Sequence, residues 1–252
     1  MMMFNLKKGR WAVILMCILI LAACAPKSGK KNVELTLGDL KRDYKEEFEF
    51  IEVVGVNDEG YDVLLVAPKS NPELQFHAYL YQGDAGGLPV VGMNSNYMDV
   101  AFLHYAPELY MKHFGISIDK EKAINDYFAF IENGQYSNLR DFNGYLETTD
   151  FVITDLNEEN MKEISEKITD ALVDFLNIHP FSMRKVDGSS GYDVFRAEIP
   201  IEFTGHKFND GNLYNSLSTD WVYDEENPQQ SVYEGLLYRK EQKEKLRDSD
   251  NQ

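Results

Sequence analysis

Three side chains between positions 104 and 113 are of the types that bind zinc: His104, Glu108 and His113. His104 and Glu108 are one helical turn apart, so a helix would place both on one side. His113 follows five residues later, out of that register, and Pro107 disturbs the helix between them. We therefore predict no metal here. His104 is expected to flank a core stripe, and His113 to be solvated near the helix end.

Two other groups of oxygen-bearing side chains have weak catalytic or binding signatures. Asp155, Asn157 and Glu159 alternate as the ligands of a calcium loop do, but the required glycine and closing glutamate are out of register. Helix capping explains them better. Ser189 and Ser190 lie in a glycine-containing turn, with no sign of the base that a nucleophile needs. Turn formation is the expected role of both serines.

Familiar catalytic motifs are absent from the sequence. It contains no phosphate-binding glycine loop, no Gly-x-Ser-x-Gly turn and no His-Glu-x-x-His pair. Its 42 Asp and Glu residues provide many accidental carboxylate pairs, so no single pair is informative. Whether the chain is an enzyme stays open, with the balance against it, and we predict no cofactor.

Aromatic residues in polar, asparagine- or glycine-containing segments are the better candidates for recognition. Such side chains combine a large contact area with a hydrogen-bonding tip. The alternative is that they anchor loops to the core, and partial exposure of several together would favour recognition. The candidates are Tyr97, Tyr214, Trp221, Tyr223 and Tyr233.

The N-terminus has the order of an export signal. Lys7, Lys8 and Arg10 precede an apolar run from Trp11 to Leu21, which ends in Leu21-Ala22-Ala23-Cys24. This ending resembles the lipobox of bacterial lipoproteins. The resemblance implies cleavage before Cys24 and a diacylglyceryl group on its sulfur. The alternative, a retained transmembrane helix, is disfavoured because the apolar run has about half of the ~20 residues needed to span a bilayer.

The resemblance implies a lipid-anchored protein on the extracytoplasmic face of a bacterial cell membrane. Residues 1–23 would be the signal peptide, and residues 24–35, which are polar and aperiodic, a flexible tether. The phrase Tyr44-Lys45-Glu46-Glu47-Phe48, followed by a β-rich stretch, loosely resembles openings of uncharacterised Gram-positive surface lipoproteins. That likeness transfers no functional residue.

Charge limits the classes of partner. Loss of Lys7, Lys8 and Arg10 with the signal changes the formal charge from −17 to −20. Nucleic acid is excluded as a partner because it has the same sign, whereas a basic protein would suit. Cys17 and Cys24 are the only cysteines, so the mature domain forms no internal disulfide and depends on packing.

Periodicity predicts an α+β fold, with an antiparallel sheet or sheets and packed amphipathic helices. Alternating and β-branched stretches predict strands at 50–56, 61–67, 74–81 and 192–203, with loops at 83–87 and 187–191. Helical stripes begin at Thr36, span Tyr97–Phe114 with a kink or break at Pro107, and cover Glu158–Asn177. Asp119 and Gly134 mark the ends of another helix.

The domain is predicted to span residues 36–238, with possible subunits 36–117 and 118–205. The segment 239–252 is charged and should be a frayed helix or disordered. Gly60-Tyr61-Asp62-Val63 recurs as Gly191-Tyr192-Asp193-Val194, which suggests two related helix-plus-hairpin units. Different strand orders in the two would contradict a duplication.

The sequence favours a non-catalytic, lipid-anchored binding or interaction protein whose partner is an extracytoplasmic protein or the cell wall. A narrower alternative is an immunity or inhibitor lipoprotein that acts against a secreted toxin. The alternative of another class is a cell-envelope hydrolase that uses dispersed carboxylates. A transport role in solute binding is less favoured, because the βαβ alternation of two doubly wound lobes is missing.

Overall fold

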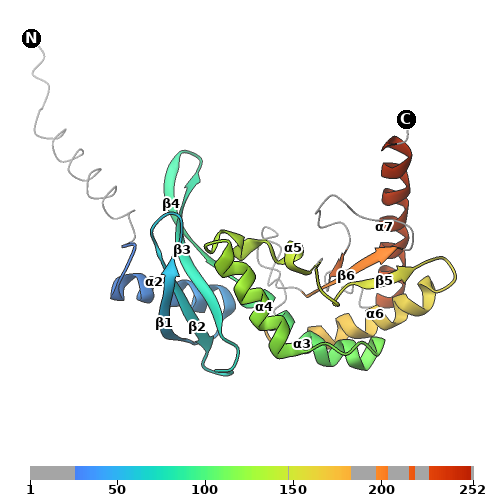
Figure 1. Cartoon of the computed structure of the whole chain (residues 1–252), viewed down its shortest axis with the longest axis horizontal. Coiled ribbons are helices and arrows are strands. Elements are labelled where there is room, and N and C mark those ends of the chain that lie inside the picture. Colours follow the sequence, from blue (N-terminus) through green and yellow to red (C-terminus); the bar gives the residue numbers. More distant parts are fainter. Residues whose placement is uncertain (1–25, 147, 183–196, 204–215, 219–226, 251–252) are drawn as a thin grey trace, which may run out of the picture. The chain divides into compact units, whose positions relative to one another are not determined.

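The computed structural model describes residues 26–146, 148–182, 197–203, 216–218 and 227–250 (Figure 1). These residues form two compact units. Unit 1 comprises residues up to Ser95 together with 135–137, and unit 2 comprises 96–134 and the residues from Asn138 onward. Helices and an antiparallel sheet confirm the predicted α+β class. The predicted subunit boundary at 117/118 is wrong, since the division falls after Ser95, where the last strand of the first sheet ends.

Unit 1 is built on a four-stranded antiparallel sheet in the order β1-β2-β3-β4. The strands are β1 Phe48–Val56, β2 Asp62–Pro68, β3 Phe76–Ala85 and β4 Leu88–Ser95. β2 and the first half of β3, Phe76 to Leu80, are buried on both faces, and β1 and β4 form the edges. The β1–β2 hairpin and the antiparallel arrangement agree with the sequence prediction.

The β3–β4 hairpin was not predicted. β3 continues to Ala85, which pairs with Leu88, so the connection is the two-residue turn Gly86–Gly87 rather than a loop over 83–87. Both glycines have positive φ, 66° and 88°, as primed hairpin turns require. The continuous apolar stretch that opens β4 lacks the alternation by which strands are recognised in a sequence.

One helix, α2, covers a face of this sheet and extends from Lys30 to Tyr44. It buries the stripe Asn32, Thr36, Leu40 and Tyr44. The helix begins six residues before the predicted start at Thr36, so the tether prediction for 24–35 is wrong for residues 30–35. The predicted stripe reached Phe48, which instead opens β1.

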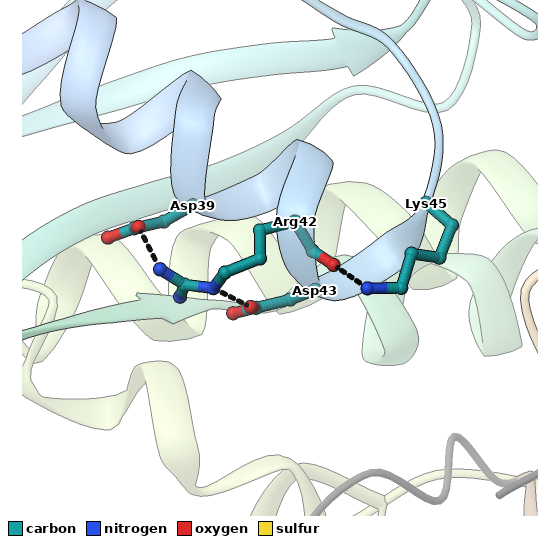
Figure 2. Close-up of polar contacts among 4 residues, drawn as sticks. All are labelled: Asp39, Arg42, Asp43 and Lys45. Atoms are coloured by element: carbon teal, nitrogen blue, oxygen red, sulfur yellow. Dashed lines mark hydrogen bonds and ion pairs between the residues drawn. The ribbon is translucent and has the colours of Figure 1, made fainter. Parts of the chain in front are cut away.

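At the C-terminal end of α2, charges are neutralised locally (Figure 2). The Arg42 guanidinium donates to Asp39 Oδ1 at 2.5 Å and to Asp43 Oδ1 at 2.8 Å. Lys45 has left-handed φ at the end of the helix, and its ammonium donates to the Arg42 carbonyl. This arrangement satisfies a carbonyl that the helix end would leave unpaired.

On the opposite face of the sheet, Tyr136 lies against β1. Its hydroxyl donates to the Val54 carbonyl at 3.0 Å, and its ring meets the edge of His77. A Cβ on Gly55 would lie 2.5 Å from the Tyr136 ring, so only glycine permits this approach. Tyr136 itself has φ of 66°, a conformation that costs energy for a residue other than glycine.

His77 makes the stability of the protein depend on pH. Burial to 2% exposure lowers the pKa of its imidazole from 6.5 to about 4. Below pH 6.5 the imidazole is protonated in the unfolded chain but stays neutral in the folded chain. The contribution of His77 to the free energy of unfolding is therefore fully present above pH 6.5 and is lost as the pH falls to about 4. A shift of this size corresponds to roughly 3 kcal/mol. Urea unfolding at pH 7 and at pH 4 measures how much free energy of unfolding each protein loses on acidification. His77→Gln should lose about 3 kcal/mol less than the parent.

The control for this experiment is His179→Gln, because His179 is exposed. This variant should lose as much free energy of unfolding between pH 7 and pH 4 as the parent does. Equal pH dependence in His77→Gln and the parent would contradict a buried, neutral imidazole at position 77.

Unit 2 combines helices with a small mixed sheet. Its helices are α3 Tyr97–Phe114, α4 Lys120–Asn133, α5 Phe142–Leu146, α6 Met161–Leu176 and α7 Pro228–Asp250, with a 3₁₀ turn over Ser137–Arg140 at the junction with unit 1. Its strands are β5 Ile153–Leu156, β6 Glu198–Phe203 and β7 Ser216–Ser218. α3 continues through Pro107 as one helix, so the proline does not divide it.

The predicted cap of α4 is confirmed. Asp119 precedes the helix, and its carboxylate accepts a hydrogen bond from the Lys122 amide at 3.0 Å, while Gly134 follows the last helical residue. Because Ala cannot accept this bond, Asp119→Ala should lower the free energy of unfolding by about 1 kcal/mol. Asp119→Asn, which retains an accepting oxygen, should lower it by less in the same denaturant titration. Equal losses in both variants would contradict the capping role.

Aromatic rings fill the core of unit 2. Phe102 on α3 is buried and stacks on Phe175 of α6, with ring centroids 5.5 Å apart. It also contacts Phe151, Phe142 and Tyr110 at 5.3 to 6.3 Å. The Phe102 side chain thus links α3 to α6, to α5 and to the segment before β5.

The small sheet of unit 2 differs in topology from the sheet of unit 1. β5 pairs with β6 in parallel, and β6 pairs with β7 antiparallel, in the order β5-β6-β7. Unit 1 instead has consecutive antiparallel strands. The proposed duplication stays a prediction, because the second Gly-Tyr-Asp-Val segment cannot be compared with the first. Most of the predicted second hairpin, including Gly191 to Val194, lies outside the described residues.

The C-terminal segment is more ordered than its composition indicated. α7 begins at Pro228, where the missing amide hydrogen and fixed φ suit a first helical residue, and it continues to Asp250. Val232 and Leu236 are fully buried, one turn apart. Of the two alternatives for 239–252, the helix is the observed one up to Asp250.

Candidate functional site

The residues considered as metal ligands do not converge. The His104 ring packs edge-on against Tyr105, while His113 Nε2 lies 2.6 Å from Asp174 Oδ2 on α6. The expectation that His113 is solvated is wrong, because its side chain is largely buried in this contact. Lys112 donates to the same carboxylate and, as the main cause, lowers the pKa of Asp174. Across the described residues, no three His, Cys, Asp or Glu side chains could hold a metal ion.

The calcium-like segment is a turn before a helix. The Asn157 side chain accepts hydrogen bonds from the amides of Glu159 and Asn160, at 2.9 and 3.2 Å. The turn leads into α6, which begins at Met161 with Asn160 as its N-cap residue and no side-chain cap hydrogen bond. The prediction that Asn157 caps the helix is therefore wrong, because its side chain closes the turn one step earlier. Ser189 and Ser190 lie outside the described residues.

The five aromatic residues predicted to serve recognition lie in different environments. Tyr97 opens α3 with only 1% of its surface exposed, so it belongs to the core and its prediction as a recognition residue is wrong. Tyr233 on α7 is half-buried and lines a pocket. Tyr214, Trp221 and Tyr223 lie outside the described residues, as does Cys24.

The pocket is a hollow of about 360 Å³ between α6 and the start of α7. Such a volume accommodates a small molecule or one side chain of a partner. α6 contributes successive turns of one helical face, and α7 contributes its first two turns. The lining residues are Lys162, Ser165, Glu166, Asn227, Gln229, Gln230 and Tyr233.

These side chains suit binding rather than covalent chemistry. An ammonium, a carboxylate and three amides provide donors and acceptors around one aromatic ring. The Ser165 hydroxyl donates to the Lys162 carbonyl within the helix at 2.7 Å, so its proton is held by the backbone and not by a base. The lining named above therefore offers hydrogen bonds to a polar ligand. It includes no pair of nucleophile and base.

A second feature concerns the start of the described chain, which is fixed to unit 1. The Asp62 amide donates to the Lys27 carbonyl at 2.8 Å, and the Gly29 amide donates to Asp62 Oδ2 at 2.9 Å. The Lys27 ammonium donates to the Glu59 carbonyl and lies 5.3 Å from the Tyr61 ring centre. Residues 27–29 are thus held at the β1–β2 turn, which corrects the tether prediction further.

Sequence reasoning missed both the pocket and this attachment. The polar residues of 26–29 match a linker in composition, and their hydrogen bonds depend on backbone groups that a pattern of side chains does not reveal. The one signal in the sequence was a charged residue, Asp62, at the start of an otherwise apolar strand, and the structure shows that it is buried.

Among the described residues, no helix has the length and apolarity that crossing a bilayer requires. Comparisons with known proteins give no relative: no protein-family model, no curated protein and no solved structure matches this chain.

Proposed function

We propose that this chain is a lipid-anchored binding protein on the extracytoplasmic face of a bacterial membrane. The observation that carries the proposal is the sequence Leu21-Ala22-Ala23-Cys24 after a charged and an apolar region. Two acyl chains on Cys24 would make membrane attachment lasting, since each buried methylene contributes about 0.8 kcal/mol.

The binding role rests on the pocket between α6 and α7. Its polar lining offers hydrogen bonds, and Tyr233 adds an aromatic surface that a ligand group can cover. Four described carboxyl groups, Glu47, Glu158, Glu163 and Asp174, have pKa values lowered by lysine partners. A general acid needs the opposite shift, so these groups give no support to the hydrolase alternative.

The narrower candidate, an immunity or inhibitor lipoprotein, is favoured by charge alone. The formal charge of −20 after loss of the signal would attract a basic secreted protein to the membrane. Cells that lack the gene would then be more sensitive to such a toxin. Unchanged sensitivity would remove this candidate and leave the general binding role in place.

The anchor is tested by intact-mass measurement of the native protein. The expected mass lacks residues 1–23 and includes a diacylglyceryl group on Cys24. Native material that keeps these residues, or that has a free thiol at position 24, would refute the proposal.

The binding role is tested in cells with a photoreactive amino acid in place of Tyr233. Illumination should give a covalent adduct, and the same residue in place of Tyr238, a tyrosine of the same helix that is 53% exposed and does not line the pocket, should give none. Indistinguishable adducts at the two positions would count against the pocket as the binding site.

A further inference from the structure

The tip of the β3–β4 hairpin exposes apolar side chains. Leu88 is 69% exposed, the highest value for a large apolar residue in the described parts of the chain, and Val90 is 40% exposed. Pro89 between them is also exposed. Several exposed apolar residues on one short turn are unusual on a soluble surface and indicate an interaction site.

This tip lies at the end of the sheet to which the N-terminal segment is fixed. In an antiparallel meander, the β1–β2 and β3–β4 turns share one end and the β2–β3 turn lies at the other. The Gln82 amide donates to Glu59 Oε2 at 2.8 Å, which sets the β1–β2 turn level with Gln82. β3 continues for three more residues, about 10 Å, so the hairpin projects beyond its neighbour, as Figure 1 shows.

The predicted anchor attaches at the same end. Cys24 is two residues before Pro26, and the Pro26 carbonyl accepts a hydrogen bond from the Asn32 side chain. Two residues span at most about 7 Å, so the acyl chains can leave the fold only near the β1–β2 turn. The membrane that receives them must lie close to this end of the sheet.

Charge at this end permits close approach to lipid. Although the mature chain has a formal charge of −20, here three lysines stand beside five carboxylates, one of them the buried Asp62, so repulsion from anionic headgroups is weak. These residues are Lys27, Lys30, Lys31, Glu34, Asp58, Glu59, Asp62 and Asp84. Lys30 and Lys31 contact Glu34 only loosely, at 3.8 and 4.0 Å.

We propose that the tip of the β3–β4 hairpin enters the headgroup and acyl boundary of the membrane, with Leu88 as its leading residue. This inference rests on the proposed lipid anchor and adds an orientation to it. Unit 1 then has two points of attachment at one end of its sheet, the acyl chains and the hairpin tip, and its β2–β3 turn faces away from the bilayer.

The test uses the mature lipidated protein in vesicles of equal parts phosphatidylethanolamine and phosphatidylglycerol. Because Cys24 is acylated and the mature chain has no other cysteine, Leu88→Cys can be labelled at one site with a nitroxide. Glu73→Cys, exposed at the opposite end of the sheet, is the matched control. Oxygen concentrates in hydrocarbon and a nickel chelate stays in water, so their effects on spin relaxation report depth.

At position 88 oxygen should have the larger effect, with a several-fold higher ratio of oxygen to nickel effects than at position 73. Equal ratios in protein that floats with the vesicles would overturn the hairpin insertion and leave the anchor standing. Failure of the protein to float would refute the anchor, and the orientation with it.

Discussion

Replacement of Cys24 by serine should abolish lipid attachment. Serine has no thiol to form the thioether, so Cys24→Ser should incorporate no labelled palmitate and should keep residues 1–23 in its intact mass. Loss of the two proposed acyl chains should also remove about 0.8 kcal/mol of membrane affinity for each methylene. This loss is larger than any single contact in the fold could offset.

Cys17→Ser is the matched control, because Cys17 lies inside the apolar region of the predicted signal. It should be labelled and cleaved as the parent is. Equal loss of label in both variants would show that export has failed rather than that the attachment site is gone. Undiminished label in Cys24→Ser would contradict the assignment of position 24.

Truncation of Phe102 should be the most damaging core substitution in unit 2. The ring is buried and contacts four other aromatic rings, the nearest with its centroid 5.3 Å away. Phe102→Ala removes these contacts and leaves a cavity, which should lower the free energy of unfolding by about 3–5 kcal/mol. Denaturant titration followed by circular dichroism measures this loss.

Phe50→Ala makes the same chemical change on β1, where the ring is 39% exposed. It should cost less than half as much. Comparable losses in the two variants would show that the rings around Phe102 are not packed as described. Phe102→Leu, which refills part of the space, should recover some of the stability.

Elements with strong local signals were predicted from the sequence. α4 combines an acidic cap with a regular apolar stripe, and both ends were located. The β1–β2 hairpin has a turn of Asn, Asp and Gly between β-branched runs. In such elements the local preference and the tertiary environment agree, so the pattern is readable without the fold.

Features set by distant backbone groups were not predictable. α2 begins at Lys30 without a side-chain cap, and the segment before it is held by hydrogen bonds to Asp62, 33 residues away from Gly29. The parallel pairing of β5 with β6 joins strands more than 40 residues apart. Neither arrangement leaves a periodic trace in the sequence.

Of the candidate site, sequence reasoning found one component. Tyr233 was selected as an aromatic in a polar segment, and it lines the pocket with six residues that were not selected. Tyr97 satisfied the same criterion and is in the core. Local polarity describes neighbours along the chain, whereas exposure depends on what packs from elsewhere, so the criterion could not separate the two tyrosines.

The path of the chain makes the two units inseparable by a single cut. It leaves unit 1 after Ser95, returns for residues 135–137, and leaves again. A fragment that ends at Ser95 would lack Tyr136, and the Val54 carbonyl would lose the hydroxyl that donates to it. A cut after Ser95 therefore separates the first sheet from Tyr136, which packs on it. To isolate unit 1 intact, residues 135–137 would have to be joined to the fragment that ends at Ser95.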